Sequence, residues 1–166
     1  SQLNKIKMNR SIYIFGIWFL FFSNMVNGQK TACYLDKDQI FLEGISAFDE
    51  GLYSLSGLKM YQFKSSLENE PGTTHLKEIS ADVYRVKLSY DMGLDNSDDL
   101  LLELERNYPG HILLQQAYLA KANYYFRIKD YTQSLNSFSE IQLNLLNREE
   151  TQTVLFKMAY SNFVKQ

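Results

Sequence analysis

The sequence predicts an all-α fold in which antiparallel helix pairs stack into a right-handed solenoid. Three segments of the chain fit one helix–turn–helix template, and segments of this kind bury their apolar faces only by stacking on one another. The 166 residues include only 2 Pro and 8 Gly, which favours long helices joined by short turns. Few stretches alternate apolar and polar residues with period two, so a β-sheet is not expected.

The clearest copy of the template covers residues 117–138. A small residue lets two helices approach where they cross, and an aromatic residue one turn later fills the gap beside it. The template positions in this copy are Tyr118, Ala122, Tyr125, Phe126, a turn at 129–131, Ser134 and Phe138. This pattern resembles that of the tetratricopeptide repeat.

An earlier copy is expected to form one helix from about Asp36 to Gly51 and a second from about Tyr53 to Leu67. The apolar residues of the first helix have the spacing of an amphipathic helix. When the turn at 51–53 is aligned with the turn at 129–131, the template positions coincide. The aligned pairs are Gly44 with Ala122, Phe48 with Phe126, Ser56 with Ser134, and Met60 with Phe138.

A weaker middle copy lies between these two. Asn96 or Ser97 is expected to cap its second helix, where Asp98 and Asp99 suit the helix dipole. Its expected elements are a loop at 70–74, a helix at 75–91, a turn at 92–95 and a helix that ends at 107–110.

The third copy is expected to run from about His111 to Leu146, and residues 148–163 then resemble the first helix of a fourth. Ala159 follows Ala122 by 37 residues, and Phe163 follows Phe126 by the same interval. A solenoid needs a polar cap, but this last helix is rich in apolar residues. We therefore expect a domain of about 3.5 repeats over 36–166, truncated from a longer protein.

Residues 1–28 have the features of a secretory signal peptide, with Met8 as the expected start. Basic residues precede an apolar stretch from Ile12 to Phe22, and small residues follow it. Cleavage is expected after Gly28, which leaves 29–35 as a linker. The alternative is a retained membrane anchor, although the apolar stretch is shorter than the roughly 20 residues that span a bilayer.

The single cysteine, Cys33, lies in this linker and cannot form an internal disulfide. We expect a free thiol. Lipidation of Cys33 is the alternative, and Lys30 argues against it because a lipidation signal has an apolar residue at that position.

The charge of the chain does not favour binding to nucleic acid. The formal net charge is −2, and removing the three basic residues of the leader leaves 14 basic against 19 acidic residues, a net charge of −5. No basic stripe remains to neutralise phosphates.

Several stretches together resemble the N-terminal part of large exported tetratricopeptide repeat proteins of Bacteroidota. They are the leader, residues 51–53, 100–109 and 122–131, and the resemblance extends over about residues 8–166. A more distant similarity is to the repeats of outer-membrane assembly lipoproteins and cell-division coordinator proteins. The resemblance implies fold and export but no particular partner. The chain departs from the repeat pattern at Val86, Asp98, Lys121, Ser134 and Ile141.

The sequence offers little for catalysis, and we expect no catalytic residue, no cofactor, no metal and no enzymatic activity. His75 and His111 occupy corresponding repeat starts and are expected to be exposed there. The sequence contains no zinc-protease, CxxC or phosphate-loop motif. Asp95, Asp98 and Asp99 lack the order of an EF-hand loop, so helix capping explains them better than calcium.

The first helix of each pair is expected to line an inner face suited to apolar or helical segments of another protein. Asn123 and Arg127 are expected to hold a carboxylate or a peptide carbonyl. The alternative is that the aromatic residues simply pack between neighbouring first helices. The candidate protein-binding groove comprises Phe41, Phe48, Lys87, Tyr90, Asn123, Phe126, Arg127 and Tyr160.

The function expected from these features is a non-catalytic protein–protein interaction scaffold, exported to the periplasm or the outer membrane. The alternatives are a targeting module of a larger enzyme and an assembly factor for envelope or secretion machinery. Membrane contact is expected only through the leader or a partner.

Overall fold

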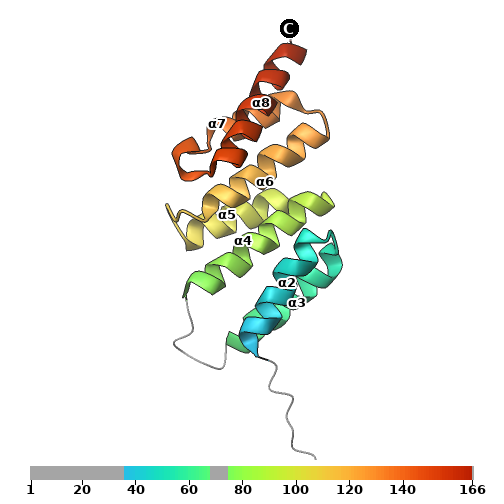
Figure 1. The fold of residues 1–166 in the computed structure, drawn as a ribbon, viewed down its shortest axis with the longest axis vertical. Coiled ribbons are helices and arrows are strands. Elements are labelled where there is room, and N and C mark those ends of the chain that lie inside the picture. Colours follow the sequence, from blue (N-terminus) through green and yellow to red (C-terminus); the bar gives the residue numbers. More distant parts are fainter. Residues whose placement is uncertain (1–35, 68–74, 166) are drawn as a thin grey trace, which may run out of the picture. The chain divides into compact units, whose positions relative to one another are not determined.

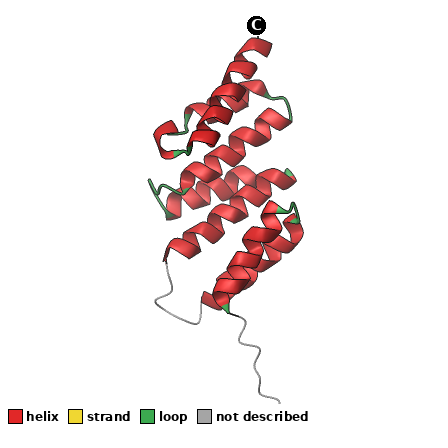
Figure 2. Ribbon diagram, in the orientation of Figure 1, coloured by secondary structure: helices red, strands yellow, loops and turns green. Residues whose placement is uncertain are grey.

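The computed structural model describes residues 36–67 and 75–165, and within these ranges every regular element is helical (Figures 1 and 2). The predicted all-α class is therefore confirmed. Residues Asp36–Gln166 form one compact unit. The leader, the cleavage site after Gly28 and Cys33 lie outside the described residues.

The described part of the chain contains seven α-helices and one short 3-10 helix. None of these helices is long and apolar enough to cross a membrane. In chain order they are α2 (Lys37–Asp49), α3 (Tyr53–Leu67), α4 (His75–Met92), α5 (Ser97–Asn107), α6 (Leu114–Arg127), α7 (Tyr131–Ser139), η2 (Leu143–Leu145) and α8 (Arg148–Val164).

The helices pack mainly on their neighbours along the chain (Figure 1). Helix α3 lies against α2, α5 against α4, and α7 against α6. Helix α4 also packs on α3 and α6, and α7 packs on α8. Three hydrophobic clusters result, one centred on α2 and α3, one on α4 to α6, and one on α6 to α8.

The second helix of the third copy is shorter than expected. Helix α7 ends at Ser139 rather than near Leu146, and an irregular stretch leads to η2. The backbone N–H of Gln142 donates to the side-chain oxygen of Gln115 at 2.8 Å. A side chain of α6 therefore satisfies a backbone N–H group that lies beyond the end of α7 and has no partner within a helix.

Helices α2, α4 and α6 end in the same way, with one residue in the left-handed region. These residues are Gly51 (φ 75°), Gly93 (φ 66°) and Lys129 (φ 65°). Each donates its N–H to the carbonyl three residues earlier, and the next N–H reaches the carbonyl five residues earlier, which is the Schellman motif. The hydrogen bonds to the carbonyl five residues earlier run from the N–H of Leu52 to Ala47, from that of Leu94 to Ser89 and from that of Asp130 to Tyr125, at 2.8, 2.9 and 2.9 Å.

We expect Gly51→Ala to lower the free energy of unfolding by about 1–2 kcal/mol, the cost of the left-handed backbone for an L-residue. No atom lies within 4 Å of the position that a Cβ would take at Gly51, so the effect is conformational rather than steric. Lys129→Gly should act in the opposite sense. Urea unfolding of both variants tests this, and equal signs would contradict the assignment of the two turns to one motif.

The first and third copies also share the contact where their two helices cross. The Ser56 hydroxyl donates to the carbonyl oxygen of Gly44 at 2.7 Å, and the Ser134 hydroxyl donates to that of Ala122 at 3.2 Å. Both serines are fully buried. A Cβ at Gly44 would lie 2.9 Å from the Met60 Cε and 3.2 Å from the Lys59 Cβ, so a larger residue at this crossing would require Met60 to shift. The alignment of these two copies is confirmed in this contact.

Candidate protein-binding face

Two residues expected in the groove belong to the core instead. Phe41 is 7% exposed and its ring centroid lies 4.9 Å from that of Phe63 on α3. Tyr90 is 1% exposed, and its hydroxyl donates to Asp98 at 2.6 Å. Each fills space between helices, so neither presents a surface to a partner, and the expectation for these two positions is corrected.

At the junction of α2 and α4, Lys87 lies on two aromatic rings. Its Nζ is 4.4 Å from the ring centroid of Phe48 and 4.3 Å from that of Tyr84. The rings of Phe48 and Tyr84 meet edge to face at 5.2 Å. Such contacts attract the ammonium to the negative ring faces.

The junction of α6 and α8 has a similar arrangement, but on α8 the lysine precedes the tyrosine, whereas on α4 the tyrosine comes first. The Nζ of Lys157 lies 5.3 Å from the ring centroid of Phe126, and the ring of Tyr160 meets Phe126 at 5.7 Å. Tyr131, at the start of α7, packs on both rings, at 5.8 Å from Phe126 and 5.9 Å from Tyr160.

The two junctions use equivalent repeat positions. Phe48 and Phe126 lie four residues after the small residues Gly44 and Ala122. The following first helix contributes an aromatic and a lysine, in either order, at two positions three residues apart. We call these six residues the aromatic face: Phe48, Tyr84, Lys87, Phe126, Lys157 and Tyr160.

Sequence reasoning missed Tyr84 and Lys157. Tyr84 lies two residues before Val86 and Lys157 two residues before Ala159, at equivalent repeat positions that the candidate groove did not include. The signal that could have identified them is the pairing of one lysine with one aromatic residue, three positions apart, in both helices: Tyr84 with Lys87, and Lys157 with Tyr160.

The two lysines are cations in partly buried surroundings. Burial lowers the pKa of Lys87, and the carboxylates of Asp49 and Asp91 oppose that shift. Burial also lowers the pKa of Lys157, whose Nζ donates to the Asn123 side-chain oxygen at 2.6 Å. Within the described residues neither ammonium has a carboxylate at ion-pair distance.

Asn123 and Arg127 are both engaged within the chain. Asn123 accepts from Lys157. Arg127 pairs with Asp91 at 3.2 Å and donates to the carbonyl oxygens of Tyr90 and Asp91, at 2.8 and 3.0 Å. Arg127 therefore satisfies the end of α4, as a cation at a helix C-terminus does. A ligand would have to displace these contacts to use either side chain.

Helix α8 exposes large apolar side chains, as expected for Phe156, Tyr160 and Phe163. These are 67%, 43% and 75% exposed. Ala159 is also exposed, whereas the aligned Gly44 and Ala122 are buried.

Asp98 has a role beyond its expected place in the first turn of α5. Asn96 occupies the N-cap of α5 and Asp98 and Asp99 lie in the first turn, as expected, but the Asn96 side chain makes no cap hydrogen bond. The Asp98 carboxylate instead accepts from Tyr90 at 2.6 Å and from Tyr125 at 3.2 Å, and Lys121 lies 3.5 Å away. In the middle copy this carboxylate takes the place of the serine–carbonyl contact, joining α4, α5 and α6.

We expect Asp98→Asn to reduce the acid sensitivity of the fold. Burial acts to raise the pKa of Asp98, but the Tyr90 hydrogen bond and the Lys121 charge outweigh it, and the pKa falls below 3.8. A carboxyl whose pKa is lower in the folded state stabilises it above pH 3.8, and this contribution is lost as the pH falls through the folded pKa. Urea unfolding between pH 7 and pH 3 should show a smaller loss of stability in the variant. An unchanged pH dependence would contradict this assignment.

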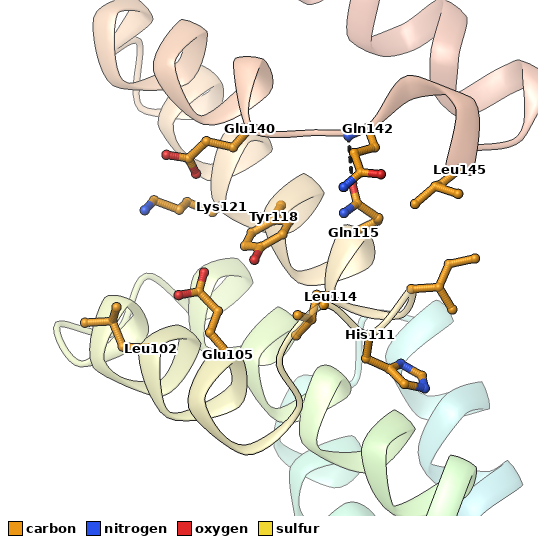
Figure 3. A pocket seen from close by; sticks show the side chains of 12 residues that line it. Leu102, Glu105, His111, Leu114, Gln115, Tyr118, Lys121, Glu140, Gln142 and Leu145 are labelled. Atoms are coloured by element: carbon orange, nitrogen blue, oxygen red, sulfur yellow. Dashed lines mark hydrogen bonds between the residues drawn. The ribbon is translucent and has the colours of Figure 1, made fainter.

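A polar cavity of about 470 Å³ lies between α5, α6 and the segment after α7 (Figure 3). Lys121, Glu105 and Glu140 line one side of it, and His111 and Leu145 line the other. Burial and the nearby Glu105 raise the pKa of Tyr118 to about 12, so Tyr118 is a neutral hydrogen-bond donor. Among the described residues that line this cavity, no nucleophile is in contact with a general base.

The two histidines differ from one another. His75 is exposed and its ring meets that of Tyr108 at 5.9 Å. His111 is half-buried rather than exposed, because its Nδ1 accepts the N–H of Leu113 at 3.2 Å. Among the described residues, no group of three or more His, Cys, Asp or Glu side chains is arranged to hold a metal ion.

Comparison of the chain with protein-family models, with curated protein sequences and with solved structures finds no match in any of the three.

Proposed function

We propose that the chain is a non-catalytic scaffold that binds another polypeptide, and that it works in the periplasm or at the outer membrane. The observation that carries the proposal is the aromatic face, where Lys87 and Lys157 rest on rings without a carboxylate in contact. Tyr160 is exposed and the other five side chains are half-buried, and partly accessible aromatic side chains are typical of binding hot spots. The leader at 1–28 supports the location.

A tetratricopeptide-like solenoid is the architecture that we propose for the repeats. The three matching helix ends and the two matching serine–carbonyl contacts support it. In such a solenoid the first helices line one inner face, so both junctions of the aromatic face would contact the same ligand.

The partner that fits this face is a segment with apolar side chains and at least one carboxylate. The apolar side chains would cover the rings of Phe48 and Phe126. The carboxylate would pair with Lys87 or Lys157, whose burial makes a charged hydrogen bond stronger than it is in water.

Site-specific photo-crosslinking in the producing organism tests this function. A benzophenone amino acid placed at Tyr84 or at Tyr160 should capture the same protein. Placed at Leu58 on α3, which is 52% exposed, it should not. Capture of that protein from Leu58 as readily as from the aromatic face would place the interface elsewhere.

The captured partner then allows a quantitative test with purified proteins. Lys87→Met and Lys157→Met keep most of the side-chain volume and remove the charge, and each should weaken binding by about 1 kcal/mol or more. Lys77→Met is the matched control, since Lys77 pairs with Asp38 at 2.6 Å. Unchanged affinity in the double variant would contradict the proposed function.

A further inference from the structure

An apolar groove of about 690 Å³ lies between α3 and α5, with α4 as its floor. Met60 and Leu88 are buried at its base, 3% and 6% exposed. Tyr61, Met92 and Leu94 on its walls are exposed by 72%, 47% and 45%. The groove is separate from the aromatic face, and it has the size and apolar lining of small-molecule sites.

Gly57 is the residue that opens this groove. It lies in the interior of α3, where glycine is less favourable than every residue except proline. A Cβ at Gly57 would meet only the Leu88 Cδ1, at an ordinary contact distance of 3.9 Å. Packing therefore does not require glycine at this position, whereas a Cβ at Gly44 would crowd Met60. The absence of a side chain at Gly57 leaves space next to Leu88 in the groove.

Among the described residues that line the groove, the two charged ones, Lys64 and Arg85, are cations. Their carboxylate partners, Asp82 and Glu103, do not line it. The pair of Arg85 with Glu103 is loose, at 3.7 Å with both side chains about half exposed, so an anion can compete for the guanidinium.

Both cations lie toward the end of the groove near the start of α4, with Tyr61 one turn from Lys64 on α3, and Met92 and Leu94 line the other end. Lys64 is paired with Asp82 near the start of α4, and Arg85 lies one turn further along the helix. Met92 ends α4, about 10 Å from Arg85 at 1.5 Å per residue. A ligand that runs along α4 would meet positive charge first and apolar surface afterwards.

We propose that this groove binds a long-chain fatty acid. The carboxylate pairs with Arg85 and Lys64, and the alkyl chain lies over Leu88, past Gly57, toward Met92. The apolar lining suits an alkyl chain, and the two cations suit an anionic head group.

Titration calorimetry with the full chain tests the proposal, using octanoate, decanoate and dodecanoate below their micelle concentrations. One dodecanoate should bind per chain, and the affinity should rise about fourfold for each added methylene group. Dodecyltrimethylammonium has the same tail with a cationic head and should bind at least about tenfold more weakly. No saturable binding of dodecanoate at millimolar concentration would overturn the proposal.

Three variants locate the site, and each carries the same residues 1–35 as the wild type, so any contribution of that segment cancels. Gly57→Phe fills the groove and should weaken dodecanoate binding at least about tenfold, whereas Gly57→Ala should change it less than about threefold. Arg85→Gln should weaken dodecanoate binding about fivefold or more and should not weaken binding of the cationic amphiphile. Circular dichroism and thermal melting establish that each variant is folded. Undiminished binding in folded Gly57→Phe, or in Arg85→Gln, would overturn the assignment.

Discussion

Phe41→Ala is expected to lower the free energy of unfolding by about 3–5 kcal/mol, the usual cost of removing a buried phenylalanine. The Phe41 side chain is 7% exposed and packs on Phe63 in a cluster that joins α2, α3 and α4. Truncation leaves a cavity that these helices cannot fill without moving. Urea unfolding monitored by circular dichroism gives the change directly.

Phe163→Ala is the matched control, because the same truncation is made at a side chain that is 75% exposed. It should change stability by no more than about 0.5 kcal/mol. Equal and small effects at both positions would mean that Phe41 is available to a partner, as the sequence suggested, and that the core of the first pair is packed differently.

Ala122→Leu is expected to destabilise the fold by about 1–3 kcal/mol, because added volume strains a close-packed crossing. Ala122 is fully buried, and its carbonyl oxygen accepts from the Ser134 hydroxyl at 3.2 Å. A leucine would push α7 away and lengthen this hydrogen bond. The thermal melting temperature should fall clearly.

Lys129→Gln tests the specificity of that result, since Lys129 is exposed and the substitution keeps a non-glycine residue in the left-handed turn. It should have little effect. If the chain tolerated both substitutions equally, the small residue would not mark a helix crossing, and the alignment of the repeats would lose its main structural support.

The sequence allowed the helices and their turns to be predicted because those features depend on local chemistry. Glycine at Gly51 and Gly93 permits the left-handed backbone, and the spacing of Gly44 and Ser56 matches that of Ala122 and Ser134. These signals act over a few residues, or over one turn and its two helices, so a sequence pattern contains them.

The roles of groove residues could not be predicted in the same way. Arg127 satisfies carbonyl groups of α4 that lie 36 and 37 residues earlier, and Asn123 accepts from Lys157, 34 residues later. These hydrogen bonds depend on the shift between one helix pair and the next, which the repeat pattern does not specify. Tyr90 was misassigned for the same reason, because its burial depends on Tyr124 and Asp98 from two other helices.

The packing of each helix mainly on its neighbours along the chain has a consequence for how the molecule forms. Loop-closure entropy is small when contacting segments are close in sequence, so folding should be fast. Within residues 36–67 and 75–165, α2 and α3 pack on one another, and each later helix packs on at least one helix that precedes it in the chain. The chain can therefore acquire structure progressively, in the order in which its residues emerge during synthesis.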